Sequence, residues 1–344
     1  MKKGLGMIIP LVLFAVILTA CSKSSGPKSQ MAAGNNSEAR VEKQQESTST
    51  EATPIPEEET DTAAQETWLR TIIDATGKEI VLEKKPERVG LLHVVYLEHF
   101  LALGAPPAAA ALGNAQGDTE ALESSELLWP YLKDEDIIML GNSRSLSLEA
   151  VLEAQPDVLV TFFNPAGLDQ QEQLEAIAPV IQVNYGATWQ EQLMTCAQVL
   201  GLEEKAREVT KDTEQVIAKT KEALEPFADR TFALFRTDGK SFIAQGTAKY
   251  YEEFGLTKPS GFTDKADTLS LEAVAQMNPY YIVFQHNLEV SKAFVDSMEA
   301  NSVWLSLDAV KNGRVYYFDE NMNSFGPLSL KLGAEKITEI YTQQ

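Results

Sequence analysis

From about residue 68 onward, the chain alternates between short apolar runs and longer segments with helical spacing. Residues 89–95 form a continuous apolar run, which is typical of a strand buried on both faces. The next segment, residues 96–103, has helical spacing and ends at Gly104, a residue suited to the left-handed turn after a helix. Helices that alternate with buried strands predict an α/β fold.

A segment of fifteen residues occurs twice. Residues 146–160 and 269–283 are identical at eight of fifteen positions, with a constant offset of 123. In each copy a serine, Ser147 or Ser270, is placed to cap a short helix. A proline then ends the helix, and an apolar strand follows. One such unit in each half of the chain predicts two similar lobes.

The longest helical pattern lies between the two copies. Residues 189–200 form a first piece, Gly201 interrupts it, and residues 203–224 form a second piece that ends before Pro226. A helix of that second length runs about 33 Å. We expect it to join the two lobes, although a surface helix of one large domain would show the same pattern. The predicted parts are a first lobe over 68–188, a connecting segment over 189–226 and a second lobe over 227–344.

The N-terminus has the features of a bacterial export signal. Two lysines precede the apolar stretch 7–20, which is too short to predict a membrane span. The tetrapeptide that ends at Cys21 resembles the lipobox of bacterial lipoproteins, in which the cysteine carries fatty acids such as palmitate and becomes the new N-terminus. This predicts a signal peptide over 1–20 and a lipid anchor on Cys21. An ordinary secretory signal with an incidental cysteine is the alternative.

The composition changes after the lipobox. Residues 21–67 are rich in Ser, Thr, Gln, Ala and Glu and show no apolar periodicity. Such a segment cannot bury enough apolar surface to fold, so we expect a disordered tether. A lipid anchor followed by a tether predicts that the folded part acts just outside a membrane.

Charge and cysteine content exclude several function classes. The chain has 50 acidic and 29 basic residues, a formal net charge of −21, which argues against nucleic-acid binding. Two cysteines exclude a disulfide scaffold, and Cys196 is expected to be a buried apolar residue. Three histidines leave little for a metal site, and no hydrolase or phosphate-loop motif is present. We therefore expect neither an enzyme nor a bound metal.

The order and spacing of several motifs resemble one family. From residue 68 to 344 the chain is similar to the periplasmic-binding proteins that serve ABC importers of iron–siderophores, haem and cobalamin. The segments that carry the resemblance are the lipobox and tether, residues 71–78, 85–89, 102–104, 148–160 and 304–318. The resemblance implies two Rossmann-like lobes joined by one long helix, with a ligand cleft between them.

The family also implies a function. We expect a monomeric receptor without a cofactor of its own, anchored through lipid on the extracellular side of the cytoplasmic membrane. It would capture a ferric siderophore and deliver it to the ABC permease. The position of one surface glutamate per lobe, which in the family pairs with permease arginines, matches Glu149 and Glu272. Favourable placement near a helix N-terminus is the alternative reason for these two acids.

Ligands of α/β proteins lie beyond the carboxyl ends of the strands, and this rule selects the candidate contacts. Arg144 and Arg236 are the strongest candidates, because the arginine fork suits the oxygens of an anionic ferric complex. A surface ion pair is the alternative for either arginine. The other candidates are His93, Tyr96, Asn164, Trp189, Tyr250 and His286.

Two alternatives to a siderophore receptor stay open. His286 is similar in position to the histidine that ligates haem iron in haem-binding relatives, so a haem or corrinoid ligand is the second hypothesis. The methionine that those relatives carry before the first repeat helix is absent, since residues 141–144 read Gly-Asn-Ser-Arg. The third hypothesis is a surface sensor that kept the fold and lost transport.

Overall fold

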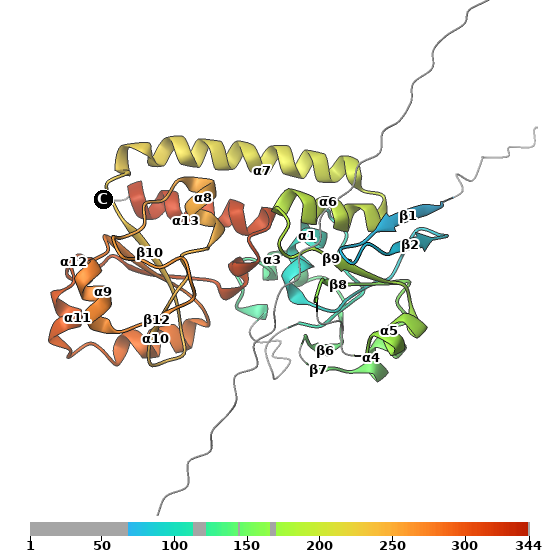
Figure 1. Ribbon diagram of the computed structural model, residues 1–344, viewed down its shortest axis with the longest axis horizontal. Coiled ribbons are helices and arrows are strands. Elements are labelled where there is room, and N and C mark those ends of the chain that lie inside the picture. The colour runs from blue at the N-terminus through green and yellow to red at the C-terminus, as the bar shows by residue number, and fades with distance from the viewer. Residues whose placement is uncertain (1–67, 113–121, 144, 166–169, 343–344) are drawn as a thin grey trace, which may run out of the picture. The chain divides into compact units, whose positions relative to one another are not determined.

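The computed structural model describes residues 68–112, 122–143, 145–165 and 170–342 (Figure 1). The predicted signal peptide, the tether, Cys21 and Arg144 lie outside these residues. Within the described ranges, no helix combines the length and the apolar composition needed to cross a membrane.

The described chain begins with a hairpin and continues into a parallel sheet. Strands β1 (Arg70–Ile73) and β2 (Glu79–Leu82) pair antiparallel around a turn at Gly77, whose φ is 81°. The first five-stranded sheet has the order β5-β4-β3-β8-β9, and its neighbouring strands all run parallel. Its strands are β3 (Val89–Leu91), β4 (Ala109–Ala110), β5 (Ile138–Met139), β8 (Val158–Phe162) and β9 (Val180–Val183).

The second sheet repeats this strand order with one difference. Its order is β12-β11-β10-β13-β14, and β10, β13 and β14 run parallel, whereas β11 is antiparallel to β10. The reversal follows from a tight turn, in which the Asp238 carboxylate accepts from the backbone of Lys240 and Ser241 and Gly239 adopts a φ of 83°. The strands are β10 (Phe232–Thr237), β11 (Phe242–Ala244), β12 (Thr268–Leu269), β13 (Tyr281–Gln285) and β14 (Val315–Phe318).

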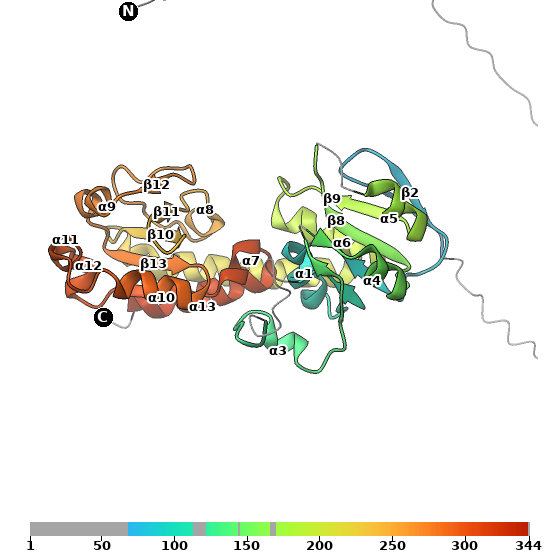
Figure 2. The same ribbon diagram turned by 90° about the horizontal axis from the view of Figure 1, so that it is seen from below.

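Short helices accompany both sheets (Figure 2). The first lobe contains the hairpin β6 (Gly141–Asn142) and β7 (Ser145–Leu146) and the helices η1 (Val94–Tyr96), α1 (Leu97–Ala102), α3 (Trp129–Leu132), α4 (Leu148–Glu153) and α5 (Gln171–Ile177). The second contains η2 (Glu225–Phe227), α8 (Lys249–Phe254), α9 (Leu271–Met277), α10 (Leu288–Asp296), α11 (Ser302–Ser306), α12 (Asp308–Lys311) and η3 (Glu320–Ser324).

The sequence repeat has the same structure in both lobes. Ser147 accepts from the Ala150 amide at 3.1 Å and begins α4, and Ser270 accepts from the Ala273 amide at 3.2 Å and begins α9. The following strand is an inner strand of its sheet: β8 lies between β3 and β9, and β13 lies between β10 and β14. The prediction of an α/β fold with two similar lobes is confirmed.

The residue before each repeat proline leaves the right-handed helical region, because proline disfavours that region for its predecessor. Gln155 has a φ of 47° and Asn278 a φ of 41°, so both take the left-handed conformation that ends a helix.

The connecting segment consists of two helices with the expected bounds. Helix α6 (Trp189–Leu200) begins at a capping box of Thr188 and Glu191 and ends at Gly201, which has a φ of 68°. Helix α7 (Glu203–Leu224) follows as one continuous helix, drawn in yellow in Figure 1. The exact residue limits of the two lobes stay a prediction.

Helix α13 (Pro327–Thr342) is a second link that the sequence analysis did not anticipate. It packs along α7, as Figure 1 shows. It also contacts α1 of the first lobe. The main hydrophobic core is continuous from the first sheet through α6, α7 and α13 to the second sheet. Helix α13 begins against α1 of the first lobe and ends beside the second sheet, where Tyr341 contacts Tyr281. It is thus a second connection between the lobes alongside α7, and both are packed with apolar side chains.

Candidate functional site

The carboxyl ends of the two sheets meet at one junction. The short helix η1 follows β3 of the first sheet, and η3 follows β14 of the second sheet. These two helices lie against each other. Ligands of α/β proteins bind beyond the carboxyl ends of strands, so this junction is the candidate site. The cleft itself stays a prediction.

On the first-lobe side, His93 follows β3 and is half-buried. Its Nδ1 accepts from the Val95 amide at 3.2 Å, and its ring packs edge-to-face against Phe162 with centroids 4.9 Å apart. Asn164 follows β8, is half-buried, and donates its backbone amide to the Gln182 side chain at 3.4 Å. These contacts fix the loop backbone and leave part of each side chain at the surface.

On the second-lobe side, Arg236 lies near the end of β10 and is half-buried. Among the described residues, its guanidinium has neither an ion pair nor a hydrogen bond. His286 directly follows β13, and its Nδ1 lies 3.6 Å from the Glu320 carboxylate, with about a fifth of each side chain exposed. This edge thus combines a cation that has no partner among the described residues with a histidine–carboxylate pair.

Three predicted ligand contacts are inside the protein instead. Tyr96 and Tyr250 have an exposed fraction of 0%, and their hydroxyls donate to the carbonyls of Val183 and Met322. Trp189 is 5% exposed and donates its indole N–H to Glu253 at 3.2 Å. In this structure the three side chains pack inside the protein, and a role in ligand contact stays a prediction.

Burial also raises the pKa of several ionisable side chains. It raises the pKa of the Tyr250 hydroxyl, so this group stays neutral. Burial likewise raises the pKa of the Glu253 carboxyl, although the hydrogen bond from Trp189 opposes the shift. Cys196 is buried, and burial raises the pKa of its thiol. This confirms the expectation that Cys196 is an apolar core residue.

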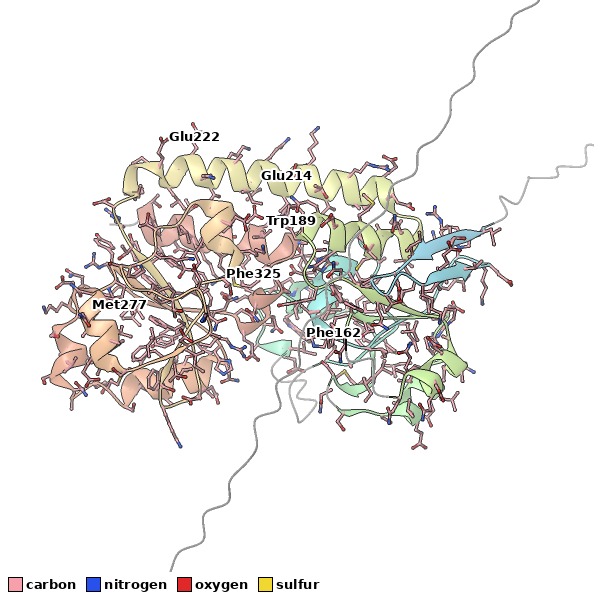
Figure 3. The ribbon with its side chains drawn as sticks, in the orientation of Figure 1. Phe162, Trp189, Glu214, Glu222, Met277 and Phe325 are labelled. Carbon is pink, nitrogen blue, oxygen red and sulfur yellow. The ribbon has the colours of Figure 1, made fainter. Side chains whose placement is uncertain are left out.

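Sequence analysis missed two aromatic residues near the junction. Phe162 ends β8, and Phe325 follows η3 in a left-handed conformation with a φ of 51°. Both are partly buried, and Figure 3 places them, with Trp189, in the middle of the view, where the first lobe approaches the second. The position of Phe162 at the end of its strand, two residues before Asn164, is a signal that the strand-end rule could have used. The left-handed backbone of Phe325 has no such signal.

The two predicted docking residues occupy matched positions. Glu149 lies in the first turn of α4 and Glu272 in the first turn of α9, each two residues after the capping serine. Both side chains are exposed, and neither has an ion pair or hydrogen bond to a described residue. Each lobe thus presents one free carboxylate at the same place.

Other surface features of the described residues do not coincide with the candidate contacts. A hollow of about 770 Å³ lies between the β10–β11 turn, the start of α9 and α10. A smaller one lies beside β2 and α5. Among the described residues, no cluster of three or more His, Cys, Asp or Glu side chains is placed to hold a metal ion.

Comparison with known proteins gives a consistent result. The family model described as periplasmic binding protein matches residues 91–322, more than half of the chain. The Fe(3+)-citrate-binding protein YfmC of Bacillus subtilis is 28% identical over 262 residues, which cover 73% of this chain and 79% of the relative. The iron-uptake system-binding protein of the same organism is 30% identical over 58% of this chain and 68% of its own length.

Solved structures share the fold. The triscatecholate siderophore binding protein FeuA from Bacillus subtilis, complexed with ferri-bacillibactin, superimposes with a TM-score of 0.65 at 20% identity, covering 80% of this chain and 99% of FeuA. The siderophore binding protein BauB, bound to acinetobactin and ferric iron, gives a TM-score of 0.65 at 20% identity, with 80% and 100% covered. The two-lobed α/β architecture, the family model and the curated relatives agree: this chain belongs to the periplasmic binding protein family.

Proposed function

We propose that this protein is the extracytoplasmic substrate-binding component of an ABC importer and that it captures a ferric siderophore. Membership of the family supports a binding role and not a catalytic one. The names of relatives and structural neighbours support iron as the cargo, because they refer to ferric citrate, iron(3+)-hydroxamate and ferri-bacillibactin. These three ligands share an iron(III) ion enclosed by oxygen donors.

The environment of Arg236 is the observation that supports an anionic ligand. Arg236 is a half-buried guanidinium without a carboxylate partner among the described residues, in a chain with a net charge of −21. A desolvated cation without a partner is unfavourable, and an anionic ligand would satisfy it. The planar fork of arginine suits carboxylate or catecholate oxygens. We therefore infer an anionic ferric complex.

The remaining parts of the proposal concern location and delivery. We infer that lipid on Cys21 holds the protein at the outer side of the cytoplasmic membrane, which the relatives named as lipoproteins support. Glu149 and Glu272 would pair with cationic side chains of the permease, one in each lobe. Their exposure and lack of partners among the described residues support this role.

The test is a titration of the purified protein with ferric citrate, a ferric hydroxamate, a ferric catecholate, haem and cobalamin, followed by tryptophan fluorescence. We expect saturable quenching by an anionic ferric complex. Arg236→Ala should weaken that binding about 10- to 100-fold, the range of a lost charged hydrogen bond. Lys240→Ala removes an exposed cation from the next turn and is the charge-matched control.

Other outcomes would redirect the proposal. Binding of haem alone would make His286 the candidate iron ligand and refute the siderophore. An Arg236→Ala variant with unchanged affinity would refute the role of Arg236. If no ligand of the panel binds, the transport receptor fails and the surface sensor becomes the leading hypothesis.

A further inference from the structure

Glu98 is a buried carboxyl group of the first lobe that contacts a helix of the second part of the chain. It lies in α1 with an exposed fraction of 1%. Its carboxylate oxygens accept from the Gly326 amide at 2.6 Å, from the Ser329 amide at 2.7 Å and from the Ser329 hydroxyl at 2.6 Å. These donors lie at the start of α13, so Glu98 occupies the N-terminus of that helix.

Burying the Glu98 carboxyl carries a desolvation penalty, and its contact with α13 offsets that penalty. Burial raises the pKa of the Glu98 carboxyl, and hydrogen bonds from Ser324, Ser329 and Gly326 oppose the shift. Among the described residues, no cation forms an ion pair with Glu98. An apolar side chain would fill this space without the desolvation penalty. The N-terminal amides of a helix, however, need an acceptor, and an anion is favoured there.

Glycine at position 326 permits the close approach. A Cβ atom on Gly326 would lie 2.6 Å from the Glu98 carboxyl group and 2.9 Å from Cε1 of His99. Both contacts are shorter than van der Waals distance, so any other residue would push α13 away from α1. Glu98, Gly326 and Ser329 thus form one close-fitting crossing.

A second carboxylate makes the corresponding contact in the opposite direction. Asp319 follows β14 of the second sheet, and its Oδ2 accepts from the Ser125 hydroxyl at 2.5 Å and the Leu127 amide at 3.1 Å. Its Oδ1 accepts from the Asn321 amide at 2.8 Å, which fixes the carboxylate in η3. Ser125 and Leu127 precede α3 in the first lobe.

We propose that Glu98 and Asp319 form a reciprocal joint that fixes the angle between the two lobes, with Glu98 as a positioning residue for ligand capture. Each lobe supplies one carboxylate and donates hydrogen bonds to the carboxylate of the other lobe. Rotation of one lobe would therefore break both sets of hydrogen bonds. A fixed angle keeps the two sheet edges at the separation that a ligand needs, and this lowers the entropic cost of binding. The part that concerns ligand capture rests on the function proposed above.

The joint is tested without any ligand. The exposed residues Glu153 and Gln276 occupy equivalent repeat positions on α4 and α9, so spin labels on Glu153→Cys and Gln276→Cys report the distance between lobes. In Glu98→Gln, an NH₂ group replaces one carboxylate oxygen, so either the Gly326 amide or the Ser329 amide loses its acceptor. We expect pulsed electron paramagnetic resonance to give a broader or shifted distance distribution. Glu126→Gln is the matched control, because Glu126, just before α3 of the first lobe, pairs with Lys336 of α13 in a more exposed contact.

A role in core stability alone predicts a different result. Glu98→Gln would then lower the melting temperature while the distance distribution of the folded protein stays that of the wild type, and this result would overturn the proposal. If Glu98→Gln does not fold, Ser329→Ala removes only the hydroxyl donor and the same comparison applies. For the ferric complex that binds the wild type, we expect Glu98→Gln to weaken affinity about tenfold. If no complex binds, the proposed function fails. The distances between the spin labels still show whether Glu98 fixes the angle between the lobes.

Discussion

His99 and His286 show how burial decides what a side chain does. His286 keeps about a fifth of its surface and lies beside Glu320 at the candidate site. His99 is fully buried in α1, and neither ring nitrogen has a hydrogen-bond partner among the described residues. Burial lowers the pKa of His99 to about 3, so its ring is neutral in the folded protein at physiological pH.

This difference predicts how stability depends on pH. Below pH 6.5 the unfolded chain protonates His99 and the folded protein does not, so the folded state loses stability as the pH falls. The loss is about 1.4 kcal/mol per pH unit between 6.5 and about 3. Glu98 acts in the opposite sense, because its pKa is raised and the folded state binds its proton first. We expect His99→Leu to remove the histidine contribution.

The measurement is urea denaturation of the wild type and His99→Leu from pH 7.5 to pH 4.5. The free energy of unfolding of the variant should fall less steeply over this range. Because Glu98 is present in both proteins, the difference between the two slopes isolates His99. Equal pH dependence of the free energy of unfolding in the two proteins would show that the His99 ring is protonated in the folded protein. This would contradict its lowered pKa.

At the scale of elements, the repeat is a unit of capped helix and buried strand. Ser147 and Ser270 each satisfy one amide at the start of a helix of six or seven residues. Such short helices are unstable alone, so their first hydrogen bonds matter. We expect Ser147→Ala and Ser270→Ala each to lower the free energy of unfolding by about 1 kcal/mol.

The double variant provides the internal check. The two serines lie in different lobes, so their effects should add when measured by urea denaturation. A substitution to glycine should lower stability by only a few tenths of that amount, since glycine tolerates the capping conformation. An effect of Ser147→Ala without one of Ser270→Ala would mean that the two copies are not equivalent.

At the scale of the whole molecule, the two lobes present matched free carboxylates. Glu149 and Glu272 are exposed and have no partner among the described residues, so their removal should leave the fold intact. We expect Glu149→Gln with Glu272→Gln to abolish uptake of the labelled ferric complex by cells while ligand affinity stays unchanged. Glu153→Gln with Glu289→Gln removes the same charge from the same two lobes and is the control.

Normal uptake by the double variant would remove these residues from docking. It would leave the favourable placement of an acid near a helix N-terminus as their role. A loss of uptake in the control variant as well would indicate a dependence on net charge and not on these two sites.

Much of the architecture was determined by the sequence alone. The α/β class, the repeat, both capping serines and the bounds of α6 and α7 follow from local patterns, because caps, prolines and apolar periodicity act over a few residues. The rule of strand ends also placed His93, Asn164, Arg236 and His286 at the edges that meet. It did not show that Tyr96 and Tyr250 are buried, since strand ends do not reveal which side chains turn inward.

Only the tertiary structure decided how the lobes are joined. The pairing of Glu98 with α13 spans more than 200 residues of sequence, and no local pattern marks a glutamate in a short helix as the acceptor for a distant N-terminus. The same holds for Asp319 and Ser125, and for the lack of any described partner of Arg236. Burial and hydrogen-bond partners depend on contacts between distant segments, so they exist only once the chain has folded.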